Sequence, residues 1–378
     1  MHLSLIPLLV LTAEPTTPPG PTWPVALQSQ VITATKAFEG ELALYVKDLR
    51  TGVEYGYNAK TPMYLASTVK LPVLIELFSQ VKAGTVSLED SVTYGEENLR
   101  DGSIKVSRAE PGTTYTFAEL ARLMMTESDN GATDLILGRI GIDNVNARLQ
   151  AFDPRFRRLT TMLDVRRHVY AHLSDAAMRM TPQQVYEVRR LKALPKKARR
   201  LSKMLEKEKG FWRARDLQNA WTSYYASELN SAPMEAMGAL LEKLAEKTLV
   251  GEDASTRMID IMLGCKTGAR RLRGLLPPHV ELAHKTGTQL RRACNVGILY
   301  VATNRPVVVA ACTKEFKALG LAEKVLAKIG KAIFDAIEAS PLSEPDAEPT
   351  SKPTDTPVAA ATQETTESSE PQPPQAEN

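Results

Sequence analysis

The sequence predicts an α+β fold: an antiparallel sheet of N- and C-terminal strands packs with helices and carries an inserted all-helical subdomain. The chain has 378 residues, 43% of them hydrophobic, which is enough for two domains or for one large domain with appendages. Strand patterns occur near both ends, at residues 42–57 and 280–311, and helical spacings fill the region between them. We therefore expect one sheet that joins the two ends of the chain.

The first 24 residues have the character of an export signal followed by a Pro/Thr-rich leader. Residues 3–11 form an apolar run that is too short to span a membrane, although the usual positive flank is missing. The expected location is secreted, periplasmic or at the cell envelope, and the alternative is a soluble apolar tail. No later run reaches about 18 apolar residues, so we expect no transmembrane segment.

The first half of the folded part begins with strands and continues with helices. Residues 41–57 predict a hairpin, and a strongly apolar helix begins near Ser67. A second helix begins at Thr116, where Glu119 completes a capping box, and breaks at residues 128–131.

The second half shows the reverse order, helices and then strands. Thr181 caps a helix, and Pro195 separates it from another that ends near Gly210. The period changes after Pro278, where three strands precede a final helix. The later helices and strands are expected at 234–249, 256–263, 280–285, 296–301, 307–311 and 321–337.

These patterns define a domain at residues 25–339 and a tail at residues 340–378. The tail is dominated by Pro, Glu, Thr, Ser and Gln and has no aromatic residue, so we expect it to be disordered. Within the domain we expect an α/β part at 25–66 and 250–339, a helical part at 67–249, and a basic helical insertion at about 165–228.

The basic stretch from Arg155 to Arg215 holds 18 Lys or Arg against five acids. Such a segment binds an anionic polymer of the cell envelope or is simply a solvated helical face. We expect no nucleic-acid partner and a monomeric protein.

Three cysteines are too few for a disulfide scaffold. Cys265, Cys294 and Cys312 have no C-x-x-C spacing, so we expect neither a metal nor a cofactor. Cys294 and Cys312 lie near adjacent predicted strands, where a bridge and two buried free thiols are equally compatible with the sequence.

A serine and a lysine three residues apart form the first candidate catalytic pair. Ser67 and Lys70 share one helix face, and an amine buried there can have its pKa lowered and take the serine proton. Ser79 and Lys82 repeat the spacing at the end of the same helix. Ser67 is the better nucleophile because free backbone N–H groups at a helix start can hold an oxyanion.

Lys-Thr-Gly also occurs twice. Lys285, Thr286 and Gly287 end a predicted strand, where a lysine can bind a carboxylate while the strand aligns an acyl amide. The copy at 266–268 follows a helix and resembles a loop, so we assign Lys285 to the site and treat Lys266 as a duplicate.

Ser128-Asp129-Asn130 occurs once, in the break between two helices. The Ser128 hydroxyl can relay a proton to a leaving nitrogen, and the Asn130 amide can bind a substrate carbonyl. The same three residues also suit an ordinary helix cap.

Together, in this order and context, the three motifs resemble those of the class A β-lactamase-like serine hydrolases, a family of penicillin-recognising enzymes. The similarity covers residues 38–153 and 230–337 and includes Leu65-Ala66-Ser67-Thr68-Val69-Lys70-Leu71 and His284-Lys285-Thr286-Gly287-Thr288. The resemblance implies that Ser67 is the acylated nucleophile, Lys70 its base, Ser128 the proton shuttle and Lys285 a catalytic cation. It further implies substrate contacts by Asn130, Thr286, Gly287, Thr288 and Arg273, and an oxyanion hole from the backbone N–H groups of Ser67 and Thr288.

The sequence departs from this family where a loop glutamate activates the deacylating water. Leu163-Asp164 is followed by two other residues and then Arg167, which stands at the expected glutamate position. A second partial match, Glu228-Leu229-Asn230, has Ala226 there, which leaves Glu228 as a possible substitute base delivered by the insertion. No histidine has the partners of a Ser-His-Asp triad.

Three hypotheses follow. The first is a hydrolase that forms an acyl-enzyme at Ser67 with β-lactams or related acyl amides and turns over slowly because the glutamate is missing, with antibiotic resistance as the associated role. The second is a D,D-peptidase or esterase acting on cell-wall peptides. The third is a non-enzymatic envelope protein that keeps the fold and binds through the basic insertion.

Overall fold

Five antiparallel strands form the sheet that joins the two ends of the folded part, which confirms the predicted α+β class. The computed structural model describes residues 22–340 except 104, 208 and 209. The strand order is β2-β1-β9-β8-β7, so the N-terminal hairpin pairs with the last strand, and β7 lies at an edge. The strands are β1 (Glu41–Asp48), β2 (Glu54–Tyr57), β7 (Glu281–Gln289), β8 (Arg292–Ala302) and β9 (Arg305–Lys314).

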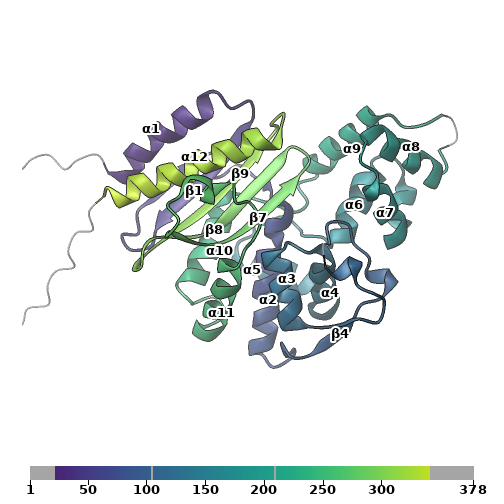
Figure 1. Cartoon of the computed structure of the whole chain (residues 1–378), viewed down its shortest axis with the longest axis horizontal. Coiled ribbons are helices and arrows are strands. Elements are labelled where there is room, and N and C mark those ends of the chain that lie inside the picture. The colour runs from purple at the N-terminus through teal and green to yellow at the C-terminus, as the bar shows by residue number, and fades with distance from the viewer. Residues whose placement is uncertain (1–21, 104, 208–209, 341–378) are drawn as a thin grey trace, which may run out of the picture. The chain divides into compact units, whose positions relative to one another are not determined.

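One face of the sheet is covered by α1 (Trp23–Lys36) and α12 (Leu319–Glu338), which lie side by side in Figure 1. Trp23, Leu27 and Val31 recur at helical spacing and are buried in this layer. The helix therefore begins at Trp23, inside the stretch that the sequence analysis assigns to the leader. Residues 1–21, where the export signal is expected, and the tail from 341 lie outside the described residues.

The helical part packs against the opposite side and supplies the larger core. Its first helix, α2, is buried on almost every side because Leu71, Leu74, Leu77 and Phe78 all face neighbours. α10 packs on β1, β8 and β9 and so belongs to the layer on the sheet, although the sequence analysis groups it with the helical part. The helices are α2 (Lys70–Lys82), α3 (Phe117–Thr126), α4 (Asn130–Ile140), α5 (Ile142–Phe152), α10 (Met234–Ala245) and α11 (Glu252–Leu263).

Short elements connect these layers. The predicted capping box is present, since the Thr116 hydroxyl accepts from the Glu119 amide and the Glu119 carboxylate accepts from the Thr116 amide. The small strands are β3 (Met63–Tyr64) with β6 (Ser231–Ala232), and β4 (Ser91–Thr93) with β5 (Thr114–Thr116). The 3₁₀ turns are η1 (Ala66–Val69), η2 (Glu96–Asn98), η3 (Val106–Arg108) and η5 (Leu272–Leu275).

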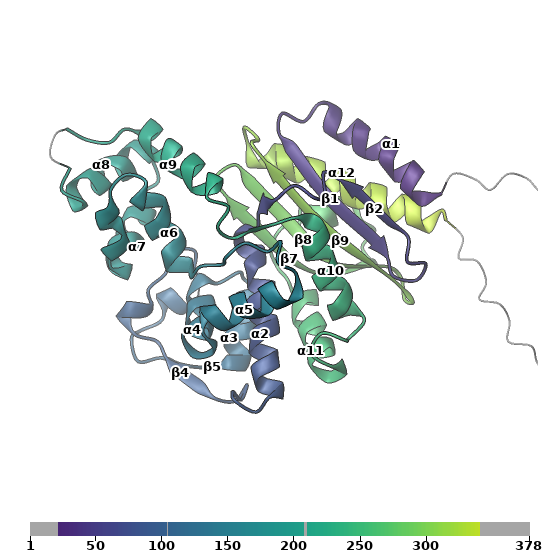
Figure 2. The same ribbon diagram turned by 180° about the vertical axis from the view of Figure 1, so that it is seen from behind.

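The basic insertion is a helical subdomain with a core of its own. Val169, Tyr170, Leu201 and Tyr224 are among its buried side chains, and the cluster reaches Tyr64 of β3. In Figures 1 and 2 its helices lie at the opposite end of the molecule from α1 and α12. They are α6 (Met162–Ala171), η4 (Asp175–Arg179), α7 (Pro182–Arg190), α8 (Leu194–Met204) and α9 (Ala214–Ala226).

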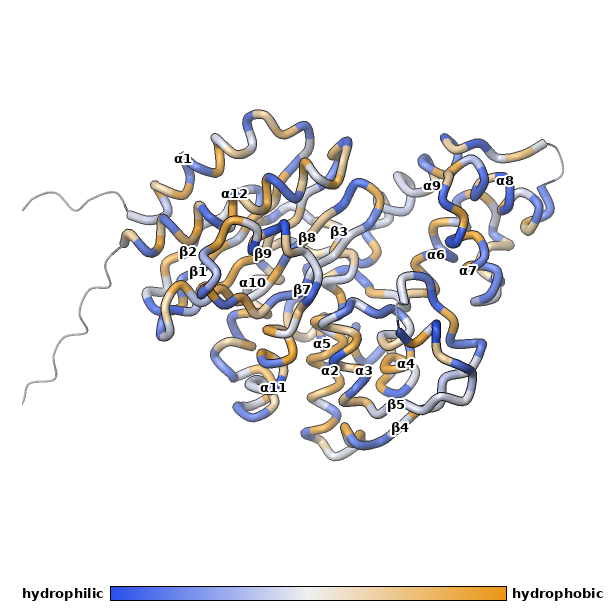
Figure 3. The backbone as a smooth tube through the Cα atoms, in the orientation of Figure 1, coloured by the Kyte–Doolittle hydropathy of each residue, from blue (hydrophilic) through white to orange (hydrophobic). Residues whose placement is uncertain are grey.

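Hydropathy follows this division. Figure 3 shows hydrophobic residues along the strands and α2, whereas α7 and α8 carry hydrophilic stretches. On α8 only Ala198, Leu201 and Ser202 are buried and Lys197 is half-buried, so most of the other basic side chains lie toward solvent. Within the described residues, no helix combines the length and the apolar character that crossing a bilayer requires.

Candidate active site

The nucleophile candidate sits at a strained entry to α2. Ser67 belongs to the 3₁₀ turn η1, which leads directly into the helix that begins at Lys70. The preceding residue, Ala66, has φ of 51°, a left-handed conformation that costs an alanine free energy. The turn and helix together place Ser67 in the wall of a groove and the Lys70 side chain behind it, fully buried.

The Lys70 amine donates to three oxygens of the Ser-Asp-Asn segment. Its Nζ lies 2.6 Å from the Ser128 carbonyl, 2.7 Å from Asn130 Oδ1 and 3.3 Å from Ser128 Oγ. Burial, followed by the positive charge of Lys285, lowers the pKa of Lys70 well below its usual value. A lysine in this position can be neutral and accept a proton.

Ser128 stands between two lysines. Lys285 Nζ lies 2.9 Å from Ser128 Oγ and 2.9 Å from the carbonyl of Thr286, and burial lowers the pKa of Lys285 to about 8. Ser128 itself has φ of 59°, and Asp129 caps α4 by accepting from the Ala132 amide. The chain from Lys70 through the Ser128 hydroxyl to Lys285 can therefore carry a proton across the site.

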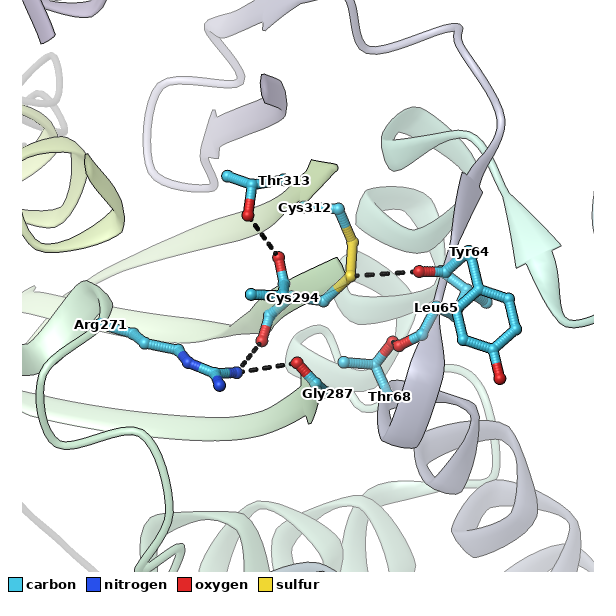
Figure 4. Close-up of a disulfide and its surroundings, with 9 residues drawn as sticks. Tyr64, Leu65, Thr68, Arg271, Gly287, Cys294, Cys312 and Thr313 are labelled. Atoms are coloured by element: carbon cyan, nitrogen blue, oxygen red, sulfur yellow. Dashed lines mark hydrogen bonds between the residues drawn. A yellow bond between two sulfur atoms is a disulfide. The ribbon is translucent and has the colours of Figure 1, made fainter. Parts of the chain in front are cut away.

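Strand β7 passes directly against the turn that holds Ser67. A Cβ on Gly287 would lie 2.5 Å from the Leu65 carbonyl oxygen and 3.0 Å from the Ser67 amide nitrogen, so only glycine permits this approach. Figure 4 shows Gly287 facing the Leu65 and Thr68 segment across this contact. The backbone of β7 next to Ser67 is thus where an oxyanion and an acyl amide would be held.

These elements enclose a groove of about 290 Å³, a size suited to a small acyl amide. Five of the predicted site residues line it, Ser67, Ser128, Asn130, Thr286 and Thr288, while Lys70 and Lys285 lie buried behind its wall. The groove is also lined by Tyr64, Asp101, Glu127, Arg166, Arg189, Asn230, Thr267, Gly268 and Arg271.

The arginine beside β7 is Arg271, two residues before the one that the resemblance indicates. Arg271 is buried, and its guanidinium donates to the Gly287 carbonyl at 2.8 Å and to Thr288 Oγ1 at 2.5 Å. Arg273 instead donates to the carbonyls of Val280 and Pro278 and does not line the groove. The expectation for Arg273 is corrected because η5 begins between the two residues and turns the second away.

The duplicate Lys-Thr-Gly is not in the site as a motif, yet two of its residues border it. Thr267 Oγ1 lies 2.5 Å from Thr286 Oγ1, and a Cβ on Gly268 would lie 2.5 Å from Thr286 Cγ2. Lys266 points to solvent and pairs with Glu127 at 2.8 Å. Sequence reasoning missed Thr267 because its importance comes from a contact across 19 residues of chain.

The insertion brings an arginine, and not a glutamate, to the groove. Arg167, at the aligned glutamate position, donates to the Met180 carbonyl at 2.8 and 2.9 Å and pairs with Asp164, away from the groove. Its neighbour Arg166 lines the groove and pairs with Asp101 at 2.8 Å. Glu228 is on the surface and pairs with Arg157, so the hypothesis that it replaces the missing base is wrong.

Asp101 and Glu127 are the carboxylates that line the groove within the described residues. Burial opposes ionisation of Asp101, but the charges and hydrogen bonds of Arg166 and Arg189 outweigh it and lower its pKa. Glu127 is occupied by Lys266. The lowered pKa makes Asp101 a weak base, and Glu127 is held in an ion pair, so neither acid resembles a base for activating water.

Two cysteine environments flank β7. Cys294 and Cys312 face each other across β8 and β9 and form a disulfide, and Cys294 lies 3.5 Å from the Tyr64 carbonyl (Figure 4). Cys265 is free, and its Sγ lies 3.4 Å from Thr267 Oγ1. The thiol also interacts with His284, whose Nδ1 lies 2.9 Å from Asn295 Nδ2. His284 is therefore a buried residue beside the site and not a surface one.

An antiparallel sheet, a helical part and a groove that joins Ser-x-x-Lys, Ser-Asp-Asn and Lys-Thr-Gly define a serine enzyme of the penicillin-recognising class. The chain belongs to the β-lactamase enzyme family, which its sequence matches over residues 26–337.

Known proteins share this fold at low sequence identity. β-Lactamase VEB-1 of Pseudomonas aeruginosa is 22% identical over 311 residues, which cover 77% of this chain and 86% of VEB-1. A β-lactamase from Sphaerobacter thermophilus DSM 20745 has a TM-score of 0.62 at 20% identity, covering 84% of this chain and 98% of that one. A PBP-A variant, described as an acyl-enzyme complex with penicillin G, has a TM-score of 0.63 at 18% identity, covering 85% and 99%.

Proposed function

We propose that the protein is a serine hydrolase that forms an acyl-enzyme at Ser67 with β-lactams or related acyl amides and releases the acyl group slowly. The observation that carries this proposal is the hydrogen-bonded chain from Lys70 through Ser128 to Lys285, at the groove that Ser67 also lines. A pure binding protein has no need of two buried lysines that share one hydroxyl.

Acylation begins when neutral Lys70 takes the proton of the Ser67 hydroxyl and the oxygen attacks the acyl carbonyl. The Ser67 and Thr288 backbone N–H groups hold the oxyanion, and Asn130 binds the side-chain amide of the substrate. As the C–N bond breaks, Ser128 passes a proton from Lys70 to the leaving nitrogen.

The carboxylate of the substrate would lie at the β7 end of the groove. Thr286 and Thr288 line this end, Lys285 lies buried behind it, and Arg271 donates to Thr288 Oγ1. A cation and two hydroxyl groups are suitable donors for a carboxylate.

Deacylation lacks a suitable base. Arg166 and the ion-paired Asp101 occupy the wall where water would need a carboxylate of higher pKa. The acyl-enzyme should therefore accumulate.

The test is the mass of the protein over time after mixing with benzylpenicillin. We expect an adduct of one penicillin on Ser67 that persists, and no adduct on Ser67→Ala. Lys285→Ala should slow acylation, whereas its matched control Lys266→Ala, in the duplicate motif, should acylate like the wild type. The absence of any adduct at saturating penicillin would refute the proposal.

A D,D-peptidase acting on cell-wall peptides is the second candidate. It uses the same acylating groups and does not need the loop glutamate, and the similarity to PBP-A is compatible with it. Release of D-Ala from a stem peptide, at a rate above that of penicillin turnover, would favour this function.

We also propose an exported protein whose basic insertion contacts an anionic envelope polymer. The Cys294–Cys312 disulfide supports export, because such bonds persist in oxidising compartments. The solvent-facing lysines and arginines of α8 support the polymer contact. Charge reversal over Lys196–Lys203 should abolish a salt-sensitive binding to the polymer.

A further inference from the structure

The groove contains a second group of cations that the reaction above does not use. Arg166 and Arg189 both line the groove and both pair with Asp101, through Arg166 Nη2 at 2.8 Å and Arg189 Nε at 2.8 Å. Both arginines come from the insertion, Arg166 from α6 and Arg189 from α7. The acid that both arginines share, Asp101, comes from the helical part.

Positive charge is in excess in this cluster. Lys197 on α8 interacts electrostatically with the same three residues. Burial and then repulsion by Arg189 and Arg166 lower the pKa of Lys197 to about 8, although Asp101 opposes the shift. One carboxylate therefore faces two guanidinium groups and an ammonium, and an added anion would balance the charge.

The hydrogen-bonding capacity of the two arginines is also incompletely used. Arg166 is buried, and its Nη1 has no hydrogen-bond partner within the described residues. Its guanidinium lies over Trp221 at 5.2 Å, which holds it in place. Arg189 donates from its Nε to Asp101, and 34% of its side chain is exposed. Its two terminal nitrogens can therefore reach a ligand in the groove.

The cluster lies beside Asn130, the residue proposed to bind the acyl amide. Asn130 Nδ2 donates to the Asp101 carbonyl at 2.6 Å, and Asn130 Oδ1 accepts from Lys70. The cluster therefore adjoins the amide that would hold the acyl group, whereas Thr286, Thr288 and Arg271 form the β7 wall. The groove thus has a separate cationic group on each of two walls.

We propose that Arg189, supported by Arg166, forms a subsite for a carboxylate on the acyl side chain of the substrate. This inference rests on the proposed acylation of Ser67 and names the preferred substrate class: acyl amides with two carboxylates, one bound at Lys285 and one at Arg189. Asp101 positions both guanidinium groups and keeps the empty subsite from carrying three uncompensated charges.

The test compares carbenicillin and benzylpenicillin, which differ by one carboxylate on the acyl side chain. The measured quantity is the ratio of their second-order acylation rates, obtained by competition with a reporter cephalosporin. Effects on Ser67, Lys70 or Lys285 cancel in this ratio. We expect carbenicillin to acylate the wild type faster than benzylpenicillin does. This preference should decrease as the salt concentration rises.

Arg189→Gln should lower the ratio about tenfold, the effect of losing one charge-assisted hydrogen bond. Arg189→Lys should give an intermediate ratio, because it keeps the charge and loses the planar fork. The matched control is Arg199→Gln, an exposed arginine of the same insertion that stacks on Phe211 at 5.3 Å and does not line the groove. It should leave the ratio unchanged.

The outcomes separate this inference from the proposed function. If benzylpenicillin acylates Ser67 and Arg189→Gln leaves the ratio unchanged, the subsite is refuted while the hydrolase stands. An equal loss in Arg199→Gln would also refute it, because the effect would then come from the net charge of the insertion. If neither penicillin acylates the wild type, the proposed function fails first.

Discussion

The two walls of the groove differ in how they treat charge. The wall formed by β7 and α2 places lysines behind hydroxyl groups, with Lys285 2.9 Å from Ser128 Oγ, and in the proposed reaction these amines would transfer protons and bind a carboxylate. The wall formed by the insertion places guanidinium groups against a carboxylate, with Arg166 2.8 Å from Asp101. An arginine stays protonated and cannot act as a base, whereas a buried lysine can.

In the proposed reaction, acylation and deacylation would depend on different parts of the chain. Under the proposed function, the β7 wall and α2 would supply the groups for acylation. The insertion would then contribute cationic side chains for binding, and no carboxylate suited to activating water, on its side of the groove. An enzyme of this design would form an acyl-enzyme faster than it hydrolyses it.

The largest expected effect is on the rate of acylation and comes from changing Lys70, which begins α2. Lys70→Met keeps the length of the side chain and removes the amine. Acylation by benzylpenicillin should therefore fall by about a thousandfold, because the carboxylates that line the described groove, Asp101 and Glu127, are held in ion pairs. Stopped-flow competition with a reporter cephalosporin measures the rate. The matched control Lys82→Met, in the duplicate Ser-x-x-Lys, should acylate normally. A Lys70→Met enzyme that folds and acylates at the wild-type rate would remove the assigned base.

A smaller effect concerns Cys265, just behind the β7 wall. Burial opposes its ionisation, but the hydrogen bond and charge of His284, with the charge of Lys285, lower the thiol pKa to about 6. The thiolate should therefore be present at pH 7 and be lost as the pH falls through about 6. Alkylation by iodoacetamide, followed by peptide mass spectrometry, should show this midpoint.

His284→Asn should move that midpoint toward the usual value of 9.0 and slow alkylation at neutral pH by about tenfold. The matched control is His279→Asn, which changes a histidine in the loop just before β7. A wild-type midpoint near 9 would show that His284 does not influence the thiol.

The smallest expected effect concerns the insertion. Restoring the family glutamate at its aligned position should not change the rate of deacylation. Arg167→Glu restores the family residue at its aligned position, but the side chain there contacts the Met180 carbonyl and Asp164 and does not line the groove. The lifetime of the penicillin adduct, followed by mass spectrometry, should equal that of the wild type. A markedly shorter lifetime would mean that position 167 reaches the acyl group.

The sequence predicted the parts of the site that depend on local spacing. Ser67 and Lys70 are one helical turn apart, and Lys285 to Thr288 lie on one strand, so periodicity places them in relation to each other. The choice between duplicates also followed from local context, since Ser79 lies near the end of α2 and contacts Arg148. The same reasoning could not assign Arg271 over Arg273, because the start of a 3₁₀ turn decides which of them faces β7.

Local patterns therefore determined the class of fold, the order of the strands and helices, and the three motifs that carry acylation. Only the tertiary structure decided which side chains share the groove: that the insertion contributes Arg166 and Arg189, that Glu228 stays on the surface, and that Cys265 meets His284. The physical reason is that these contacts join residues far apart in the chain. Their pairing depends on packing and on the burial of charge, which no spacing along the sequence encodes.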